Sequence, residues 1–148
     1  MIDDFCLLDT NILVYATDID SPFYQKAKDV RDNAHGRRIK GCVALQVLTE
    51  FYSVVTNPRK NKKPLSSMQA RKEIENYLKS PTIFKISIKA TTIEKMVELA
   101  EKYGTKGPNV YDLQLMATML DNGVRKIYTA NEKDFVIFKE IETVNPFK

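Results

Sequence analysis

The clearest structural signal in the chain is Phe5-Cys-Leu-Leu-Asp9-Thr10-Asn11-Ile-Leu-Val-Tyr-Ala16. An apolar run of strand length ends at the carboxylate of Asp9, and two oxygen-rich residues follow before a second apolar run begins. This pattern predicts a buried strand that leads into a helix. In parallel sheets with crossover helices, ligands bind at the carboxyl ends of the strands, where Asp9 would lie. Asp is also a preferred N-cap residue, so a functional role and a purely capping role both stay open for Asp9.

The rest of the chain alternates between short apolar runs and helical patterns. Further strands are predicted at residues 39–44, 83–88, 127–129 and 141–144, and helices at residues 21–34, 45–57, 66–78, 91–104 and 110–122. Strands that alternate with helices predict an α/β domain with a mostly parallel central sheet flanked by helices. No repeat, linker or low-complexity segment suggests a second domain, so we expect residues 1–148 to form one domain.

Composition narrows the class of protein. With 148 residues and 43% hydrophobic content, the chain can bury a sizeable core without disulfides. Cys6 and Cys42 lie in apolar runs, have no CxxC partner and accompany a single histidine, so we expect neither a zinc site nor a disulfide and infer a reducing cytoplasm. Asp3 and Asp4 stand where a signal peptide needs basic residues, and no apolar run has the length of a membrane span. We therefore expect no signal peptide and no membrane association.

Basic residues cluster in the predicted loop 58–64. The net charge is +4, and this loop contains Arg59, Lys60, Lys62 and Lys63. Such a cluster could contact a phosphate backbone and so bind a nucleic-acid substrate. Charge runs of this kind are also common on solvated surfaces, so the cluster alone is weak support for nucleic-acid binding.

Four carboxylates are predicted at the ends or margins of buried elements, namely Asp9, Glu50, Asp112 and Asp134. If the sheet brings them together, their charges repel unless a cation neutralises them or some bind protons. Mg²⁺ or Mn²⁺ takes oxygen ligands and leaves positions for substrate phosphates, which favours phosphodiester hydrolysis. Each residue also has an ordinary structural alternative, because Glu50 could be solvated and Asp112 and Asp134 could cap their own turns.

Other hydrolase and phosphotransfer patterns fit less well. A haloacid-dehalogenase phosphatase needs a second Asp where Asn11 stands, and a receiver domain needs its phosphoacceptor Asp in the region of residues 46–50. A histidine-based nuclease or a Ser-His-Asp hydrolase would depend on His35, which lies at the predicted end of a polar helix. No glycine-rich phosphate loop occurs in the sequence.

Four motifs in order resemble the PIN-domain nucleases, particularly the VapC-like toxins. They are Leu-Leu-Asp9-Thr10-Asn11-Ile-Leu-Val-Tyr, Thr49-Glu50-Phe51, Val110-Tyr111-Asp112-Leu113-Gln114-Leu115-Met116-Ala117 and Tyr128-Thr129-Ala130-Asn131-Glu132-Lys133-Asp134-Phe135. Each motif alone is weak, but the similarity covers nearly the whole chain. The resemblance implies a Rossmann-like sheet, a Mg²⁺ or Mn²⁺ centre, endoribonuclease activity on RNA and inhibition by a cognate antitoxin.

The resemblance also implies roles for individual residues. Asp9, Glu50 and Asp112 match the acidic triad of the family, and Thr10 and Asn11 match the polar residues that support it. We expect Asp9 and Asp112 to hold the metal directly, and Glu50 to bind it through water or to orient the attacking water.

At the fourth acidic position of the family, this chain has an amide side chain, Asn131, in place of a carboxylate. Many members have an Asp where Asn131 stands, and Asp134 is the nearest carboxylate. An amide lacks the charge that would compensate a second divalent cation, so we expect one tightly held metal ion. Asp134 would then act at the edge of the site, with Thr129 and Asn131 as supporting residues.

The predicted helix 110–122 bears on the partners. Leu115 and Met119 lie outside its main apolar stripe, so the helix is either fully buried or paired with another chain. The resemblance favours a homodimer and a small antitoxin whose tail covers the acidic site. Two competing functions remain open, namely a PIN nuclease of RNA processing or repair without an antitoxin, and a non-catalytic module that binds nucleic acid or a partner.

Overall fold

A parallel sheet forms the centre of the computed structural model, which describes residues 5–148. Its strands are β1 (Phe5–Leu8), β2 (Lys40–Ala44), β3 (Phe84–Ile86), β4 (Lys126–Tyr128) and β5 (Glu142–Val144). They lie in the order β3-β2-β1-β4-β5, and every neighbouring pair is parallel. The predicted α/β fold is thus confirmed. The expectation drawn from Asp3 and Asp4 falls outside the described residues.

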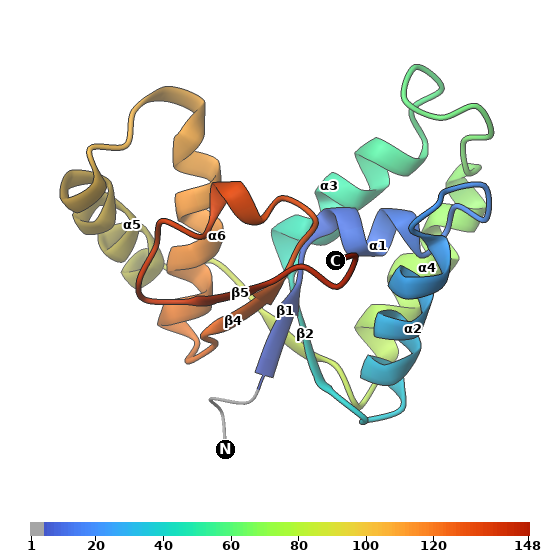
Figure 1. Ribbon diagram of the computed structural model, residues 1–148, viewed down its shortest axis with the longest axis horizontal. Helices are drawn as coiled ribbons and strands as arrows, with labels where there is room; N and C mark the ends of the chain where they lie inside the picture. The colour runs from blue at the N-terminus through green and yellow to red at the C-terminus, as the bar shows by residue number, and fades with distance from the viewer. Residues whose placement is uncertain (1–4) are drawn as a thin grey trace.

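Helices cover both faces of this sheet. They are α1 (Thr10–Tyr15), α2 (Tyr24–His35), α3 (Leu45–Val55), α4 (Ser67–Lys79), α5 (Ala90–Tyr103) and α6 (Val110–Asp121), with 3₁₀ turns η2 (Gly107–Asn109) and η3 (Glu132–Asp134). In Figure 1, α5 and α6 lie on one side of the sheet, and α1, α2 and α4 lie on the other. Within residues 5–148, the structure contains no helix with the length and apolar character that a membrane crossing needs.

The carboxyl end of β1 shows how the sheet positions a functional residue. The strand is buried at Cys6, Leu7 and Leu8, and it is central because β2 and β4 pair with it on either side. Asp9 follows directly, and its N–H donates to the carbonyl of Tyr128 at the end of β4. The turns that follow β1 and β4 are therefore held side by side at the same edge of the sheet.

The helix α6 is enclosed within a single chain. Its buried residues include Leu115 and Met119, which are 7% and 0% exposed. In Figure 1, α5 runs beside α6 on the same side of the sheet. Of the two alternatives for this helix, burial within the chain therefore accounts for its apolar faces, and α6 gives no support for a homodimer.

A close approach between α2 and β2 gives a stability prediction. A Cβ on Gly41 of β2 would lie 2.5 Å from the Cβ of Ala34 on α2, and both residues are buried. Gly41→Ala is expected to lower the free energy of unfolding by about 1–3 kcal/mol through overpacking. Denaturant unfolding in a double-mutant cycle with Ala34→Gly should show that the two changes compensate each other. A Gly41→Ala protein as stable as the wild type would contradict this packing.

Candidate active site

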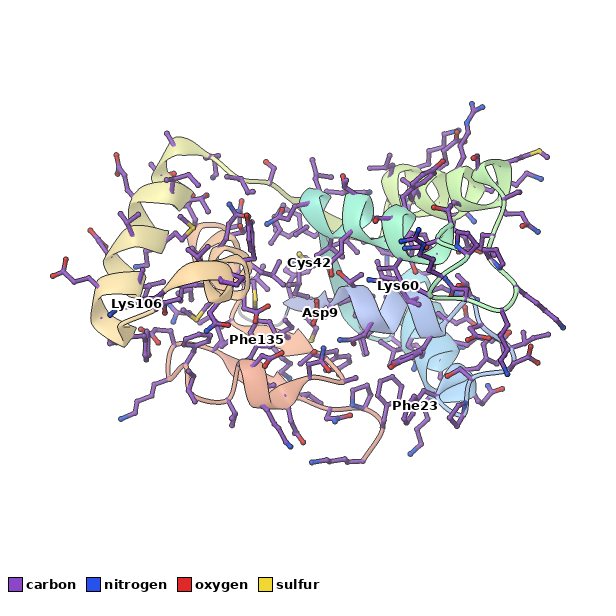
Figure 2. The ribbon with its side chains drawn as sticks, turned by 90° about the horizontal axis from the view of Figure 1, so that it is seen from above. Asp9, Phe23, Cys42, Lys60, Lys106 and Phe135 are labelled. Carbon is purple, nitrogen blue, oxygen red and sulfur yellow. The ribbon has the colours of Figure 1, made fainter. Side chains whose placement is uncertain are left out.

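All four predicted carboxylates line one pocket of about 680 Å³ at the carboxyl ends of the strands. Asp9 follows β1, Glu50 lies on α3, Asp112 lies in the first turn of α6, and Asp134 ends η3. The supporting residues Thr10, Asn11 and Asn131 line the same pocket. Figure 2 shows Asp9 in the middle of the molecule, at the start of α1. The structure thus brings together side chains that are up to 125 positions apart in sequence.

Asp9 is held by three hydrogen bonds. Its Oδ1 accepts from the Thr10 N–H at 2.8 Å, and its Oδ2 accepts from Thr129 Oγ1 at 2.8 Å and from Asn11 Nδ2 at 3.3 Å. Asp9 is therefore the N-cap of α1 and also a pocket residue, so the two readings of the sequence are compatible. Burial raises the pKa of Asp9 although these hydrogen bonds favour the charged form.

Thr129 and Asn11 tie the turn after β4 to the turn after β1. Thr129 is fully buried, and its Oγ1 also accepts from Asn11 Nδ2 at 3.2 Å and from the Asn131 N–H at 3.0 Å. Asn11 Oδ1 accepts from the Ala130 N–H at 3.0 Å. Because both turns share these bonds, the Asp9 carboxylate has a fixed orientation toward the pocket.

The other three carboxylates have no hydrogen bond or ion pair with any residue of the described chain. Asp112 and Asp134 therefore do not cap their own turns in this structure. Burial, followed by the charges of Asp134, Asp9 and Glu50, raises the pKa of Asp112 to about 6. The pocket thus holds negative charge that the protein itself leaves uncompensated.

The raised pKa of Asp112 predicts a pH-dependent stability for the metal-free protein. Below about pH 4, Asp112 is protonated both folded and unfolded, and it contributes nothing. Between about pH 4 and pH 6 the unfolded chain releases the proton while the folded chain keeps it, so stability falls as pH rises. Above that range the penalty persists, on the order of 1 kcal/mol after discounting for solvent screening.

Thermal melts in the presence of a chelator test this effect. Asp112→Asn removes the charge, so its melting temperature should exceed that of the wild type at pH 7.5, and the difference should shrink toward pH 4. Melting curves of the two proteins that stay parallel across this pH range would show that Asp112 carries no such penalty.

The donors of the pocket fit a hard divalent cation. The candidate residues offer carboxylate, hydroxyl and amide oxygens, which Mg²⁺ and Mn²⁺ prefer. Thr10 Oγ1 and Gln46 Oε1 are buried at the pocket and have no hydrogen-bond partner among residues 5–148. Among residues 5–148, however, no three Asp, Glu, His or Cys side chains form a ready-made ligand set. A site with two carboxylate ligands completed by water is the arrangement that suits these donors.

Several pocket residues were not singled out from the sequence. Gln46 lies one turn before Glu50 on α3, and its Nε2 donates to Thr118 Oγ1 of α6 at 3.0 Å. Tyr111 precedes Asp112 and is 70% exposed at the pocket. Gln46 could have been predicted from its spacing of four residues from Glu50, because residues at i and i+4 lie on the same face of a helix.

The four cations predicted to contact RNA do not all lie at the candidate site. Lys60 lines both the carboxylate pocket and a neighbouring pocket next to Phe23, whereas Lys62 and Lys63 line the neighbouring pocket and not the carboxylate pocket. Lys63 Nζ lies 3.8 Å from an Asp20 carboxylate oxygen, and Arg59 lines neither pocket. Only one of the four cations is therefore placed at the candidate site.

A parallel five-stranded α/β domain with carboxylates gathered at its strand ends defines the class of this protein. The family model described as the PIN domain matches residues 6–142. The chain therefore belongs to the PIN domain family, as its motifs indicated.

Individual relatives agree with this assignment. The chain is 27% identical over 139 residues to a protein named Ribonuclease VapC48 from Mycobacterium tuberculosis, covering 94% of this chain and 95% of the relative. The fold matches the crystal structure of VapC20 from the same species, described as a sarcin-ricin loop cleaving toxin, with a TM-score of 0.66, 12% identity and coverage of 90% and 95%. It also matches VapBC2 from Rickettsia felis, bound to a DNA fragment of its promoter, with a TM-score of 0.64, 22% identity and coverage of 95% and 98%.

Proposed function

We propose that this protein is a metal-dependent endoribonuclease that hydrolyses RNA phosphodiester bonds, and that it is the toxin of a VapBC-type toxin–antitoxin pair. The observation that carries the proposal is the pocket in which Asp9, Glu50, Asp112 and Asp134 meet while three of them lack a protein partner. Charge of this kind is balanced most simply by a divalent cation. The names of the relatives, a ribonuclease and several toxin–antitoxin complexes, agree with the activity and the biological role.

The roles of the residues follow from their surroundings. Asp9 and Asp112 would hold Mg²⁺ or Mn²⁺ directly, with Thr10 and Asn11 beside them. When bound, such an ion lowers the pKa of water and stabilises negative charge on the phosphate. Thr129 fixes the orientation of Asp9 through its 2.8 Å hydrogen bond. Glu50 has no competing partner, so its carboxylate is available to accept a hydrogen bond from the attacking water and to orient it.

Cleavage assays test this function directly. Purified protein should cut RNA in the presence of Mg²⁺ or Mn²⁺ and should stop when a chelator is added. Salt-sensitive RNA binding with no metal-dependent products would instead indicate a non-catalytic binding module, and would overturn the proposal.

The proposed partners need a separate test. Expression of the wild type should arrest growth, Asp9→Asn should not, and co-expression of the antitoxin should relieve the arrest. An active nuclease that does not arrest growth would instead be a stand-alone enzyme of RNA processing or repair. We further propose that the toxin acts in the cytoplasm as a homodimer whose pocket the antitoxin covers. A strictly monomeric protein at micromolar concentration in analytical ultracentrifugation would contradict the homodimer.

A further inference from the structure

Lys60 differs in charge from the other side chains that line the carboxylate pocket. Within the described part of the chain, it is the one cation among the lining residues, which include the carboxylates of Asp9, Asp18, Glu50, Asp112 and Asp134. Lys60 forms no ion pair with any described residue, so its ammonium group is available for a ligand. Lys60 lines the same pocket as Asp9, and Figure 2 labels it near α1.

The backbone of Lys60 is fixed relative to α3. Its N–H donates to the carbonyl of Asn57 at 3.1 Å, just after the helix that carries Glu50. The amide of Asn61 donates to the carbonyls of Val54 at 2.6 Å and Asn57 at 3.1 Å. The start of the loop is thus tied to the end of α3, and a flexible four-carbon stem extends the Lys60 ammonium from this fixed point.

The negative charge of the pocket would repel an RNA phosphate, and the Lys60 ammonium is positioned to reduce this repulsion. Five carboxylates line the pocket, and a single divalent ion compensates only two of their charges. An RNA phosphate that enters therefore meets residual negative charge. During hydrolysis the water oxygen bonds to phosphorus, the bond from phosphorus to the leaving ribose oxygen breaks, and a proton of the water passes through solvent to that oxygen. Negative charge on the phosphate oxygens has to be stabilised in this transition state.

We propose that Lys60 contacts a non-bridging oxygen of the scissile phosphate and is a catalytic residue of the RNA hydrolysis. This inference rests on the proposed nuclease function and assigns one further group to the same site. Lys62 and Lys63 line the neighbouring pocket, so they contact phosphates of the flanking RNA and contribute to affinity. Lys60 lines both pockets, including the one that holds the carboxylates, so it is assigned to catalysis, whereas Lys62 and Lys63 are assigned to binding.

Single-turnover cleavage at saturating RNA separates these roles, with Mn²⁺ present in excess. Lys60→Gln should lower the saturating rate about 10²-fold, the cost of removing one preorganised contact to the transition state. Lys60→Arg keeps the charge and should recover part of the loss. Lys62→Gln removes the same charge nearby and should mainly raise the RNA concentration that gives half the maximal rate. The control is Lys106→Gln, since Figure 2 shows Lys106 far from Asp9, and it should match the wild type.

A Mn²⁺ titration distinguishes a catalytic role of Lys60 from a purely structural one, because the two roles predict different effects on the affinity for Mn²⁺. Removing a cation from an acidic pocket favours a divalent ion, so Lys60→Gln should bind Mn²⁺ as tightly as the wild type or more tightly, although it cleaves slowly. A rate loss that excess RNA or excess Mn²⁺ restores would overturn the role of Lys60, and so would equal rate losses in Lys60→Gln and Lys62→Gln. A wild type that cleaves no RNA would overturn the proposed function itself, so the two failures are distinguishable.

Discussion

Asp9→Asn is expected to lower the rate of metal-dependent RNA cleavage by about 10³-fold, the upper end of the cost of one lost electrostatic contact in an active site. The substitution preserves the shape of the side chain. Asn still offers Oδ1 to the Thr10 N–H, which Asp9 accepts at 2.8 Å, so the start of α1 should keep its cap. It removes the charge that would hold the metal ion, together with the Oδ2 atom that accepts from Thr129 Oγ1 and Asn11 Nδ2.

Single-turnover cleavage and thermal melts together test this prediction. The melting temperature of metal-free Asp9→Asn should stay near that of the wild type, because removal of a buried charge offsets the loss of the two hydrogen bonds that Oδ2 accepts. Asp29→Asn, an exposed change on α2, is the matched control and should cleave normally. Full cleavage by Asp9→Asn at ordinary Mn²⁺ concentrations would show that Asp9 is not a ligand of the catalytic ion.

Asp134→Asn is expected to weaken Mn²⁺ binding roughly 10 to 100-fold, as is typical when a residue that supports metal ligands is changed. Asp134 lines the pocket, and its charge is the largest charge effect on the pKa of Asp112. Its carboxylate caps no turn in the structure, so the cost of about 1 kcal/mol that follows loss of a cap should be absent. Asn131→Ala should have a milder effect on the metal, because the amide of Asn131 carries no charge.

Mn²⁺ titrations of the cleavage rate, with melts of the metal-free proteins alongside, distinguish these outcomes. The Asp134→Asn titration should shift to higher Mn²⁺ concentration while the melting temperature is retained. An unchanged titration with a lowered melting temperature would remove Asp134 from the site and assign it a purely structural role.

Local sequence patterns predicted those parts of the fold whose stabilising contacts are also local. Ser66 and Gln69 have the spacing of a capping box, which predicts the helix start at residue 66. This start is confirmed, because the Gln69 N–H donates to Ser66 Oγ at 3.1 Å and the Ser66 N–H donates to Gln69 Oε1 at 2.9 Å. The predicted start of α2 at Ser21 was wrong. Ser21 Oγ instead accepts from the Phe23 N–H at 3.1 Å in a turn, and the helix begins after Phe23.

The start of α5 shows why a local pattern can fail. Thr91 and Glu94 have the spacing of a capping box, but α5 begins directly after Lys89, whose N–H donates to Thr92 Oγ1 at 3.0 Å. The Thr92 hydroxyl donates in turn to Asp121 of α6 at 2.6 Å. A contact with a helix that follows in sequence therefore accompanies the earlier start, and no local pattern contains that information.

In the candidate site, too, some features could be predicted from the sequence and others depend on contacts between distant residues. Hydrophobic patterning and the family motifs predicted that Asp9, Glu50 and Asp112 would gather at the strand ends, and the structure places them in one pocket. The hydrogen bond from Thr129 to Asp9 joins residues 120 positions apart, so its geometry could not be predicted from the sequence. The position of Lys60 at the pocket likewise depends on how the loop folds back onto α3.

Anomalous diffraction from crystals grown with Mn²⁺, measured at the manganese absorption edge, tests the metal centre most directly. We predict one strong peak in contact with the carboxylates of Asp9 and Asp112, and no comparable peak in Asp9→Asn crystals. The absence of a peak in the pocket of the wild type, at Mn²⁺ concentrations that support cleavage, would contradict the assignment of these carboxylates as the metal ligands.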